Sequence, residues 1–250
     1  MTKLTLFIIF LGFSAATGLF LQHTSIPAIK ALTTAEKIAV QREQQSSAIL
    51  RSTVRIHLRS WTVKEDESGY IWDESIGHAT LRDGRFLVTH NHYALLDKGT
   101  APAGMSVALF NSRGTLLFSA PFTDFQVTQE GAETLVFELK PDHWQRQLAA
   151  SGIISAPFAG WQELDLQPGM EVGQIDWDGA TSRVDWATVE AVNTQDGVPR
   201  VTLNEWVTQG GSGGGVFWNG THIGNNWQAA EHLDGAGTVV GFTSVAALNE

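Results

Sequence analysis

Short apolar runs separated by turn residues recur along most of this 250-residue chain. Each run has the length of a β-strand and is bounded by Gly, Asp or Pro, a pattern that favours strands. Helical patterns are few, since only residues 33–50 and 141–151 read as helices. With 25 glycines and 43% hydrophobic residues, the sequence predicts an all-β fold with a real core. The clearest strand candidates are Thr53–Leu58, Phe86–Thr89, Leu116–Ala120, Thr134–Leu139 and Arg200–Leu203.

One glycine-rich run, residues 209–216, places Ser212 among glycines, and an apolar strand that ends in His92 lies upstream of it. A serine hydroxyl is a poor nucleophile until a neighbouring imidazole accepts its proton. Glycines let the backbone adopt conformations closed to other residues, so the amides of Gly210 and Ser212 can point at one position. The two segments together predict a nucleophile, a base and an oxyanion hole.

These two segments resemble the chymotrypsin-like (trypsin-fold) serine peptidases, most closely their cysteine-free bacterial members. The run Leu87-Val88-Thr89-His90-Asn91-His92 is similar to the family's strand ending in Leu-Thr-Ala-Ala-His. The run Gly210-Gly211-Ser212-Gly213-Gly214-Gly215-Val216 is similar to Gly-Asp-Ser-Gly-Gly-Pro-Val, with glycine in place of Asp and of Pro. The resemblance covers residues 50–248 and implies two packed six-stranded antiparallel β-barrels with the substrate cleft between them.

Other segments match the family in the same order along the chain. They look like the opening strand, the hairpin before the histidine strand, the turn and strand before the serine, and two strands that border the cleft. In that order they are Ser52–Ile56, Gly77–Gly84, Gln167–Val172, Thr221–Trp227 and Val240–Val245.

The resemblance implies the members of a catalytic site. Ser212 takes the place of the nucleophile, His92 that of the base, and the amides of Gly210 and Ser212 that of the oxyanion hole. The family's aspartate opens a strand of the form Asp-Ile-Ala-Leu-Leu-Lys-Leu, which the run beginning at Glu133 resembles. Glu133 is therefore the expected triad acid, with Asp124 and Glu130 as alternatives.

The resemblance also implies where substrate binds. The residue six positions before the serine lies at the base of the primary specificity pocket, and here it is Trp206. Asn226 and Trp227 are expected to line the wall of that pocket. These residues are neutral, and a buried cation needs a charged partner, so we expect neutral polar or small substrate side chains to be accepted before Lys or Arg.

The resemblance also bears on activation. In the family's animal members the amino terminus newly formed by cleavage pairs with the Asp before the serine, and Gly211 cannot form that pair.

The composition narrows the classes of partner. The formal net charge is −10 and no basic stretch is interleaved with aromatic residues, which argues against nucleic acid as a partner. The chain has no cysteine, so packing rather than disulfides holds the core. We expect a polypeptide substrate and a mechanism that needs neither a metal nor a cofactor.

The amino-terminal end reads as a separate element. Lys3 is followed by an uncharged, mostly apolar stretch, residues 4–21, which fits a signal peptide or a short membrane anchor. Residues 22–50 read as a partly helical tether, in which Thr33 and Glu36 form a capping box, and residues 51–250 as the peptidase domain. These features predict an extracytoplasmic protein that is secreted, periplasmic or membrane-anchored.

Three other functions fit part of the sequence. The first is a catalytically inactive peptidase fold that acts as a binding module, motivated by the departures at Gly211, Gly215 and Glu133. The second is an esterase-type hydrolase, since residues 210–214 also fit a nucleophile elbow, which must lead from a strand into a helix. The third is a zinc site at His90 and His92, for which no third ligand is evident.

Overall fold

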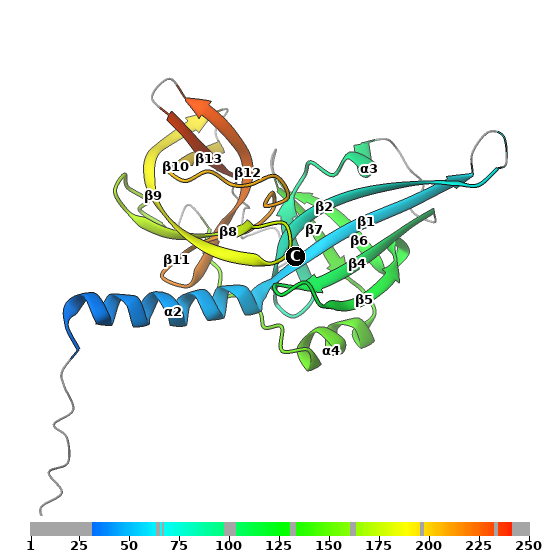
Figure 1. Ribbon diagram of the computed structural model, residues 1–250, viewed down its shortest axis with the longest axis horizontal. Helices are drawn as coiled ribbons and strands as arrows, with labels where there is room; N and C mark the ends of the chain where they lie inside the picture. The colour runs from blue at the N-terminus through cyan, green and yellow to red at the C-terminus, as the bar shows by residue number, and fades with distance from the viewer. Residues whose placement is uncertain are drawn as a thin grey trace, which may run out of the picture. The chain divides into compact units, whose positions relative to one another are not determined.

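The computed structural model describes residues 32–63, 66, 68–97, 104–130, 134–160, 164–195, 198–232 and 235–241 (Figure 1). The chain divides into two compact units, Met1–Ala39 and Val40–Glu250. The second unit contains two antiparallel β-sheets, which confirms the expected all-β fold.

The first sheet has seven strands in the order β5-β4-β1-β2-β3-β7-β6. The two edge strands, β5 and β6, are separated along the chain only by a single 3-10 turn, η2, at Phe122–Asp124. β5 pairs with β4 and β6 pairs with β7, so one bent strand joins both edges of the sheet. The seven strands are thus the expected six, with the fifth interrupted at η2. Their bounds are β1 Thr53–Val63, β2 Tyr70–Arg82, β3 Phe86–His90, β4 Met105–Asn111, β5 Leu116–Pro121, β6 Phe125–Glu130 and β7 Thr134–Leu139.

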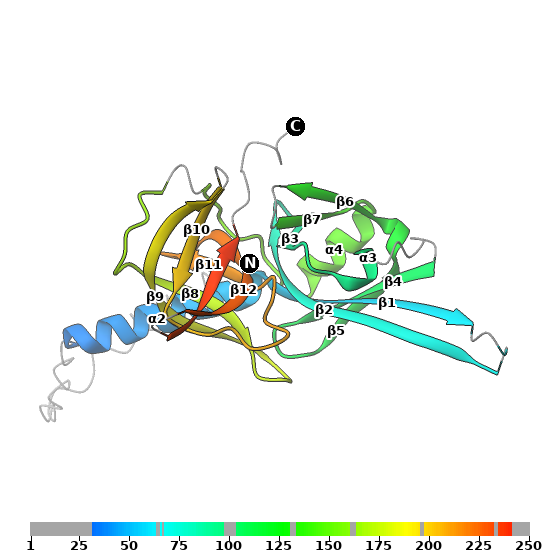
Figure 2. The ribbon, with the colours of Figure 1, turned by 90° about the horizontal axis from the view of Figure 1, so that it is seen from above.

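The second sheet is a closed six-stranded barrel in the order β10-β13-β12-β11-β8-β9 (Figure 2). Every pairing in it is antiparallel, and closure removes the exposed edges that an open sheet would carry. The strands are β8 Glu171–Trp177, β9 Ser182–Gln195, β10 Val198–Leu203, β11 Gly215–Trp218, β12 Thr221–His232 and β13 Gly235–Gly241. We call the two sheets the first and the second barrel.

Alternation along the strands builds a separate core in each barrel. In β1, Val54, Ile56 and Leu58 are fully buried, because every second side chain of a strand points to the same face. They belong to a large cluster in the first barrel that includes Phe137. The second barrel has its own, smaller cluster, which includes Ile223.

Three α-helices accompany the barrels in the part of the chain that the structure describes: α2 Thr34–Ser52, α3 Ala94–Asp97 and α4 Asp142–Ala150. Both predicted helices are present. The predicted capping box is confirmed, since the Thr33 amide donates to Glu36 Oε2 at 2.7 Å and the Glu36 amide donates to Thr33 Oγ1 at 3.2 Å. α2 continues to Ser52, and its Ile49 packs against buried apolar side chains of the second unit.

No helix in the portion of the chain that the structure describes is long and apolar enough to cross a bilayer. The apolar segment at residues 4–21 lies outside the described residues.

Candidate active site

Ser212 lies in a tight loop between β10 and β11, which we call the glycine loop and define as Gly210–Gly214. Backbone hydrogen bonds from the second barrel hold it from one side. The Gly211 amide donates to the Thr208 carbonyl at 2.8 Å, and the Gly213 amide donates to the Asn226 carbonyl at 2.8 Å. The loop that carries the predicted nucleophile is therefore anchored to its own barrel.

The first barrel holds the same loop from the other side through His78 on β2. The His78 amide donates to the Ser212 carbonyl at 2.9 Å, and the His78 ring nitrogen Nδ1 lies 2.9 Å from the Gly210 carbonyl oxygen. Because a carbonyl only accepts, Nδ1 carries the proton and donates it. Two carbonyls of the loop are thus fixed by one residue of the other barrel.

Gly213 brings the loop against the strand that carries the histidine motif. A methyl group at Gly213 would lie 2.3 Å from the His78 carbonyl oxygen, 2.3 Å from Thr89 Oγ1 and 2.7 Å from His90 Cδ2. Its φ of +77° is also a value that residues with a β-carbon rarely adopt. Only glycine permits this approach, which brings the loop that contains Ser212 against Thr89 and His90.

The two histidines of that segment differ in environment. His90 is buried and stacks on Tyr93 with ring centroids 4.6 Å apart, and its Nδ1 accepts the amide of His92 at 2.9 Å. Burial, with smaller contributions from His92 and His78, lowers the pKa of His90 to about 3, so its ring is neutral. His92 is exposed, as a base that must meet substrate and nucleophile needs to be.

Trp227 on β12 connects the second barrel to His92. The two rings lie 5.1 Å apart between centroids, and the indole nitrogen of Trp227 donates to Asn91 Oδ1 at 3.3 Å. The structure therefore gathers the predicted base, the serine loop and one predicted substrate contact around the same place.

Gly211 departs from the family pattern for a reason that the structure makes visible. A methyl group there would lie 2.5 Å from Val207 Cγ2 and 2.9 Å from Asp176 Oδ1. Both neighbours are buried, so neither side chain can swing into solvent. The space beside residue 211 is filled by a carboxylate from β8 instead of a side chain of the loop itself.

That carboxylate, Asp176, is fully buried and is surrounded by hydrogen-bond donors. Its oxygens accept the Thr208 amide at 2.7 Å, the Thr208 hydroxyl at 2.9 Å and Arg183 Nη2 at 2.7 Å. Burial by itself would raise the pKa of Asp176, but hydrogen bonds from Thr208, the Trp177 amide and Arg183 outweigh it and lower the pKa. Asp176 is thus ionised, and it holds Thr208, which lies just before the glycine loop.

The three candidates for the triad acid differ in how far the structure describes them. Glu133 lies outside the described residues, immediately before β7, and Glu130 is the last residue of β6. Asp124 ends η2, and its Oδ2 accepts the indole N–H of Trp144 on α4 at 2.7 Å. That bond gives Asp124 a structural partner, and the assignment of Glu133 stays a prediction.

The predicted pocket residues have different exposures. Trp206 is 44% exposed, whereas Val207 beside it is buried. Asn226 is fully buried and its amide group donates to the Ile175 carbonyl at 2.6 Å, while its main chain bonds Gly213 and Gly214. Substrate contacts by Trp206, Asn226 and Trp227 remain predictions.

Sequence reasoning did not single out His78 or Asp176. His78 falls in the predicted Gly77–Gly84 hairpin, and no sequence motif there marks a histidine as functional. Asp176 carried a usable signal, since this charged residue directly follows Ile175 near the end of a strand that also contains Val172 and Gly173. A buried charge in such a strand must be paired, which marks it as a residue with a specific task.

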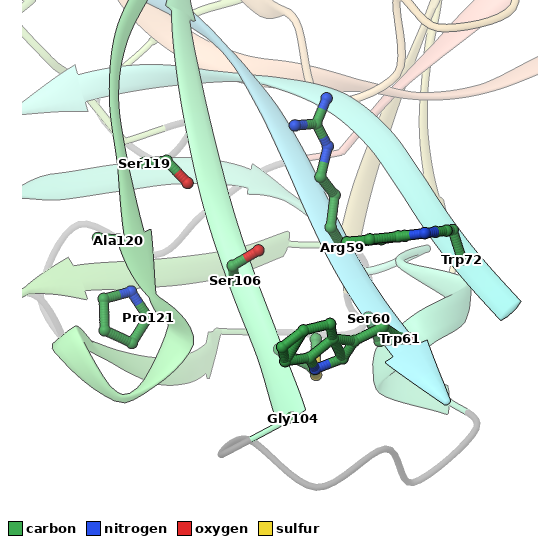
Figure 3. Close-up of a pocket in the computed structure, with 10 residues that line it drawn as sticks. Arg59, Ser60, Trp61, Trp72, Gly104, Ser106, Ser119, Ala120 and Pro121 are labelled. Atoms are coloured by element: carbon green, nitrogen blue, oxygen red, sulfur yellow. The ribbon is translucent and has the colours of Figure 1, made fainter. Parts of the chain in front are cut away.

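A pocket of about 360 Å³ lies elsewhere, on the first barrel between β1, β2, β4 and β5 (Figure 3). Trp61 and Trp72 flank it on the part of the β1–β2 hairpin that extends beyond β4, and both are more than half exposed. Neither Ser212 nor His92 lines this pocket. Within the described residues no three His, Cys, Asp or Glu side chains are grouped to hold a metal ion.

Comparison with solved structures identifies the architecture. A variant of the HtrA-type protease AlgW with a decapeptide superposes with a TM-score of 0.57 at 13% identity, over 84% of this chain and 64% of that one. The Rv3671c protease from M. tuberculosis in its active form gives a TM-score of 0.52 at 18% identity, over 84% of both chains. This chain has the trypsin-like fold.

The inactive form of the Rv3671c protease is similar to the same degree, with a TM-score of 0.53 at 18% identity over 84% of this chain and 92% of that one. The present chain spans less than two thirds of the length of the AlgW structures. No protein-family model and no curated protein sequence matches the chain.

The structure also excludes the nucleophile elbow that an esterase-type hydrolase would need, because the glycine loop leads into strand β11 and not into a helix.

Proposed function

We propose that this trypsin-like chain is a serine endopeptidase in which Ser212 is the nucleophile. The observation that carries the proposal is the close approach of the glycine loop to the histidine segment, through Gly213 against Thr89 and His90. A loop that served only as a connection would need neither this approach nor the anchoring of its carbonyls. The peptides in the AlgW structures support a polypeptide substrate.

The proposed reaction is acyl transfer. Ser212 Oγ attacks the scissile carbonyl while His92 takes its proton, and the carbonyl oxygen becomes an oxyanion held by the amides of Gly210 and Ser212. His92 then gives the proton to the departing amine. Water repeats the sequence on the acyl-enzyme and restores the serine. Glu133 accepts a hydrogen bond from the imidazole and fixes its tautomer.

A fluorophosphonate probe tests the proposal, because it labels only an activated serine. We expect labelling of the wild type, and none of Ser212→Ala or His92→Ala, while the exposed Ser119→Ala control labels fully. Folded wild type that does not react would favour the inactive binding module.

Two further variants separate the candidate acids, Glu133→Gln and Asp124→Asn. We expect only Glu133→Gln to lower turnover, by about four orders of magnitude, which is the loss that follows replacement of the acid in a chymotrypsin triad. Turnover on a peptide substrate measures the effect. A loss of that size in Asp124→Asn instead would move the acid to η2.

The pH profile tests the base. His92 must be neutral to accept the serine proton, so kcat/KM is expected to rise with pH as the imidazole loses its proton. A flat profile from about pH 5 to 8 contradicts His92 as the base.

The apolar segment at residues 4–21 supports an extracytoplasmic location for this activity. Fractionation of cells that express the full chain tests it, with activity expected in the extracytoplasmic fraction or in the membrane pellet. Activity confined to the cytosolic fraction would contradict that location.

A further inference from the structure

His78 is the one side chain of the first barrel with a described hydrogen bond to the main chain of the glycine loop. It lies on β2, is fully buried, and uses both ring nitrogens. Nδ1 faces the Gly210 carbonyl at 2.9 Å and Nε2 faces Ser182 Oγ at 2.8 Å. Since Nδ1 must donate to the carbonyl, Nε2 has no proton and accepts the Ser182 hydroxyl.

Two of the loop's peptide groups are hydrogen-bonded at both their carbonyl and their N–H, and a third, Gly211–Ser212, is bonded at its carbonyl, which accepts the Gly214 amide at 3.0 Å. The Gly210–Gly211 peptide is held at both ends, its carbonyl by His78 and its N–H by the Thr208 carbonyl. The Ser212–Gly213 peptide is held the same way, its carbonyl by the His78 amide and its N–H by the Asn226 carbonyl. Among the described residues, the amides of Gly210 and Ser212 donate to no protein acceptor. These are the two amides that the proposed oxyanion hole uses.

We propose that His78 is the positioning residue of the oxyanion hole, holding the Gly210 carbonyl so that the Gly210 and Ser212 amides stay directed at the substrate oxygen. The inference rests on the proposed function. Rotation of the Gly210–Gly211 peptide would break the hydrogen bond to Nδ1 and reorient the adjoining amides. A fixed set of donors costs no reorganisation when the oxyanion forms.

The chemistry of the site suits this task. A histidine buried without a carboxylate partner is neutral, and burial lowers the pKa of His78 to about 4 despite the opposing effect of the Gly210 bond. A neutral ring offers one donor and one acceptor, which match the Gly210 carbonyl and the Ser182 hydroxyl. A carboxylate at position 78 would repel the carbonyl, and an aliphatic side chain would leave it without a donor.

Two amide substitutions separate the two ring nitrogens. In His78→Asn the side-chain NH₂ occupies the place of Nδ1 and still reaches Gly210, whereas in His78→Gln it occupies the place of Nε2 and reaches Ser182. We expect His78→Gln to lower kcat by about 10- to 100-fold, less than removal of an oxyanion donor, with KM within about threefold. His78→Asn and Ser182→Ala are expected to keep kcat within about threefold of the wild type, because both retain the donor to Gly210.

The measurements are kcat and KM on a peptide substrate, with near-ultraviolet circular dichroism to establish folding of each variant. A wild type that fails to react with the fluorophosphonate probe overturns the proposed function itself. A reactive wild type with folded His78→Gln of equal kcat overturns only the role of His78, as does an equal kcat loss in Ser182→Ala and His78→Gln. If His78→Gln does not fold, His78→Asn still tests the proposal, because a loss of about tenfold in the folded variant overturns it.

Discussion

The apolar core of the first barrel and the polar contacts around the glycine loop are two different kinds of region. The core is a cluster of twenty described buried residues that includes Phe137. The glycine loop is instead held by buried polar side chains of both barrels. His78 of the first barrel bonds the Gly210 carbonyl, while Asp176 of the second barrel bonds Thr208 and Asn226 bonds the loop through its main chain.

The difference separates stability from geometry. Apolar burial is non-directional and roughly proportional to area, so the core of the first barrel adds stability without fixing the geometry of the loop. Hydrogen bonds between buried groups are directional and costly to leave unmade, so the polar contacts from both barrels can hold a glycine-rich loop in one shape. Substitutions in the first core are therefore expected to lower the free energy of unfolding, and substitutions at the polar contacts to change the loop.

The largest expected effect of a single substitution is in the first core. Phe137 is buried, with its ring centroid 5.7 Å from that of Tyr93 and 6.1 Å from that of Phe122. Phe137→Ala is expected to lower the free energy of unfolding by about 3–5 kcal/mol, since a cavity adds to the lost burial. Urea denaturation measures it, with the exposed Leu116→Ala as a control expected within about 0.5 kcal/mol of the wild type. Equal losses in the two variants would contradict a core centred on Phe137.

The next effect appears on acidification and involves both barrels. Burial is the main cause that lowers the pKa of His78 and His222 to about 4 and that of His90 to about 3. The unfolded chain takes up protons near pH 6.5 while the folded chain does not, so stability is complete above about pH 6.5 and falls as the pH drops towards 4. Each such histidine removes about 3 kcal/mol by the end of that range.

Urea denaturation at several pH values between about 7 and 4.5 measures this loss. His78→Asn removes one of the three groups, so the dependence of unfolding free energy on pH should become shallower by about 1.4 kcal/mol per pH unit in the middle of the range. An unchanged slope would mean that His78 is not neutral in the folded protein.

The strands and the start of α2 could be predicted from the sequence because they depend on local pattern. Short apolar runs such as Thr53–Leu58 predicted the β-strands, and the capping residues Thr33 and Glu36 predicted the start of a helix. The segments around Ser212 and His92 were found by local motifs, and their catalytic roles stay predictions. The interruption of the fifth strand at η2 had no local signal, because it reflects the closure of the first barrel. His78 was also missed, since its importance comes from Gly210, which lies 132 positions along the chain and meets it only in the folded protein.

The contact between the barrels can be tested by two glycines with nearly equal φ. Gly213, at +77°, lies against His78 and Thr89, whereas Gly220, at +79°, has no atom within 4 Å of where a methyl group would be. Gly220→Ala costs only its backbone conformation, about 1 kcal/mol. Gly213→Ala adds overpacking of about 1–3 kcal/mol and displaces Ser212, so activity is expected to fall far more than in Gly220→Ala. Urea denaturation and fluorophosphonate labelling measure the two effects, and equal labelling of both variants would contradict the close approach.

The smallest effect concerns two ion pairs on the same strand. On β8, Asp176 is fully buried and pairs with Arg183, whereas Glu171 is 45% exposed and pairs with Arg42 of α2. Water screens an exposed pair, and ordering two long side chains costs entropy, so Glu171→Gln is expected to lower the free energy of unfolding by no more than about 1 kcal/mol. Asp176→Asn should cost more, because an amide in its place presents an N–H to donors that need an acceptor. Urea denaturation in low and high salt compares them: salt should weaken only the Glu171 pair, and equal losses would mean that burial does not set the strength of these contacts.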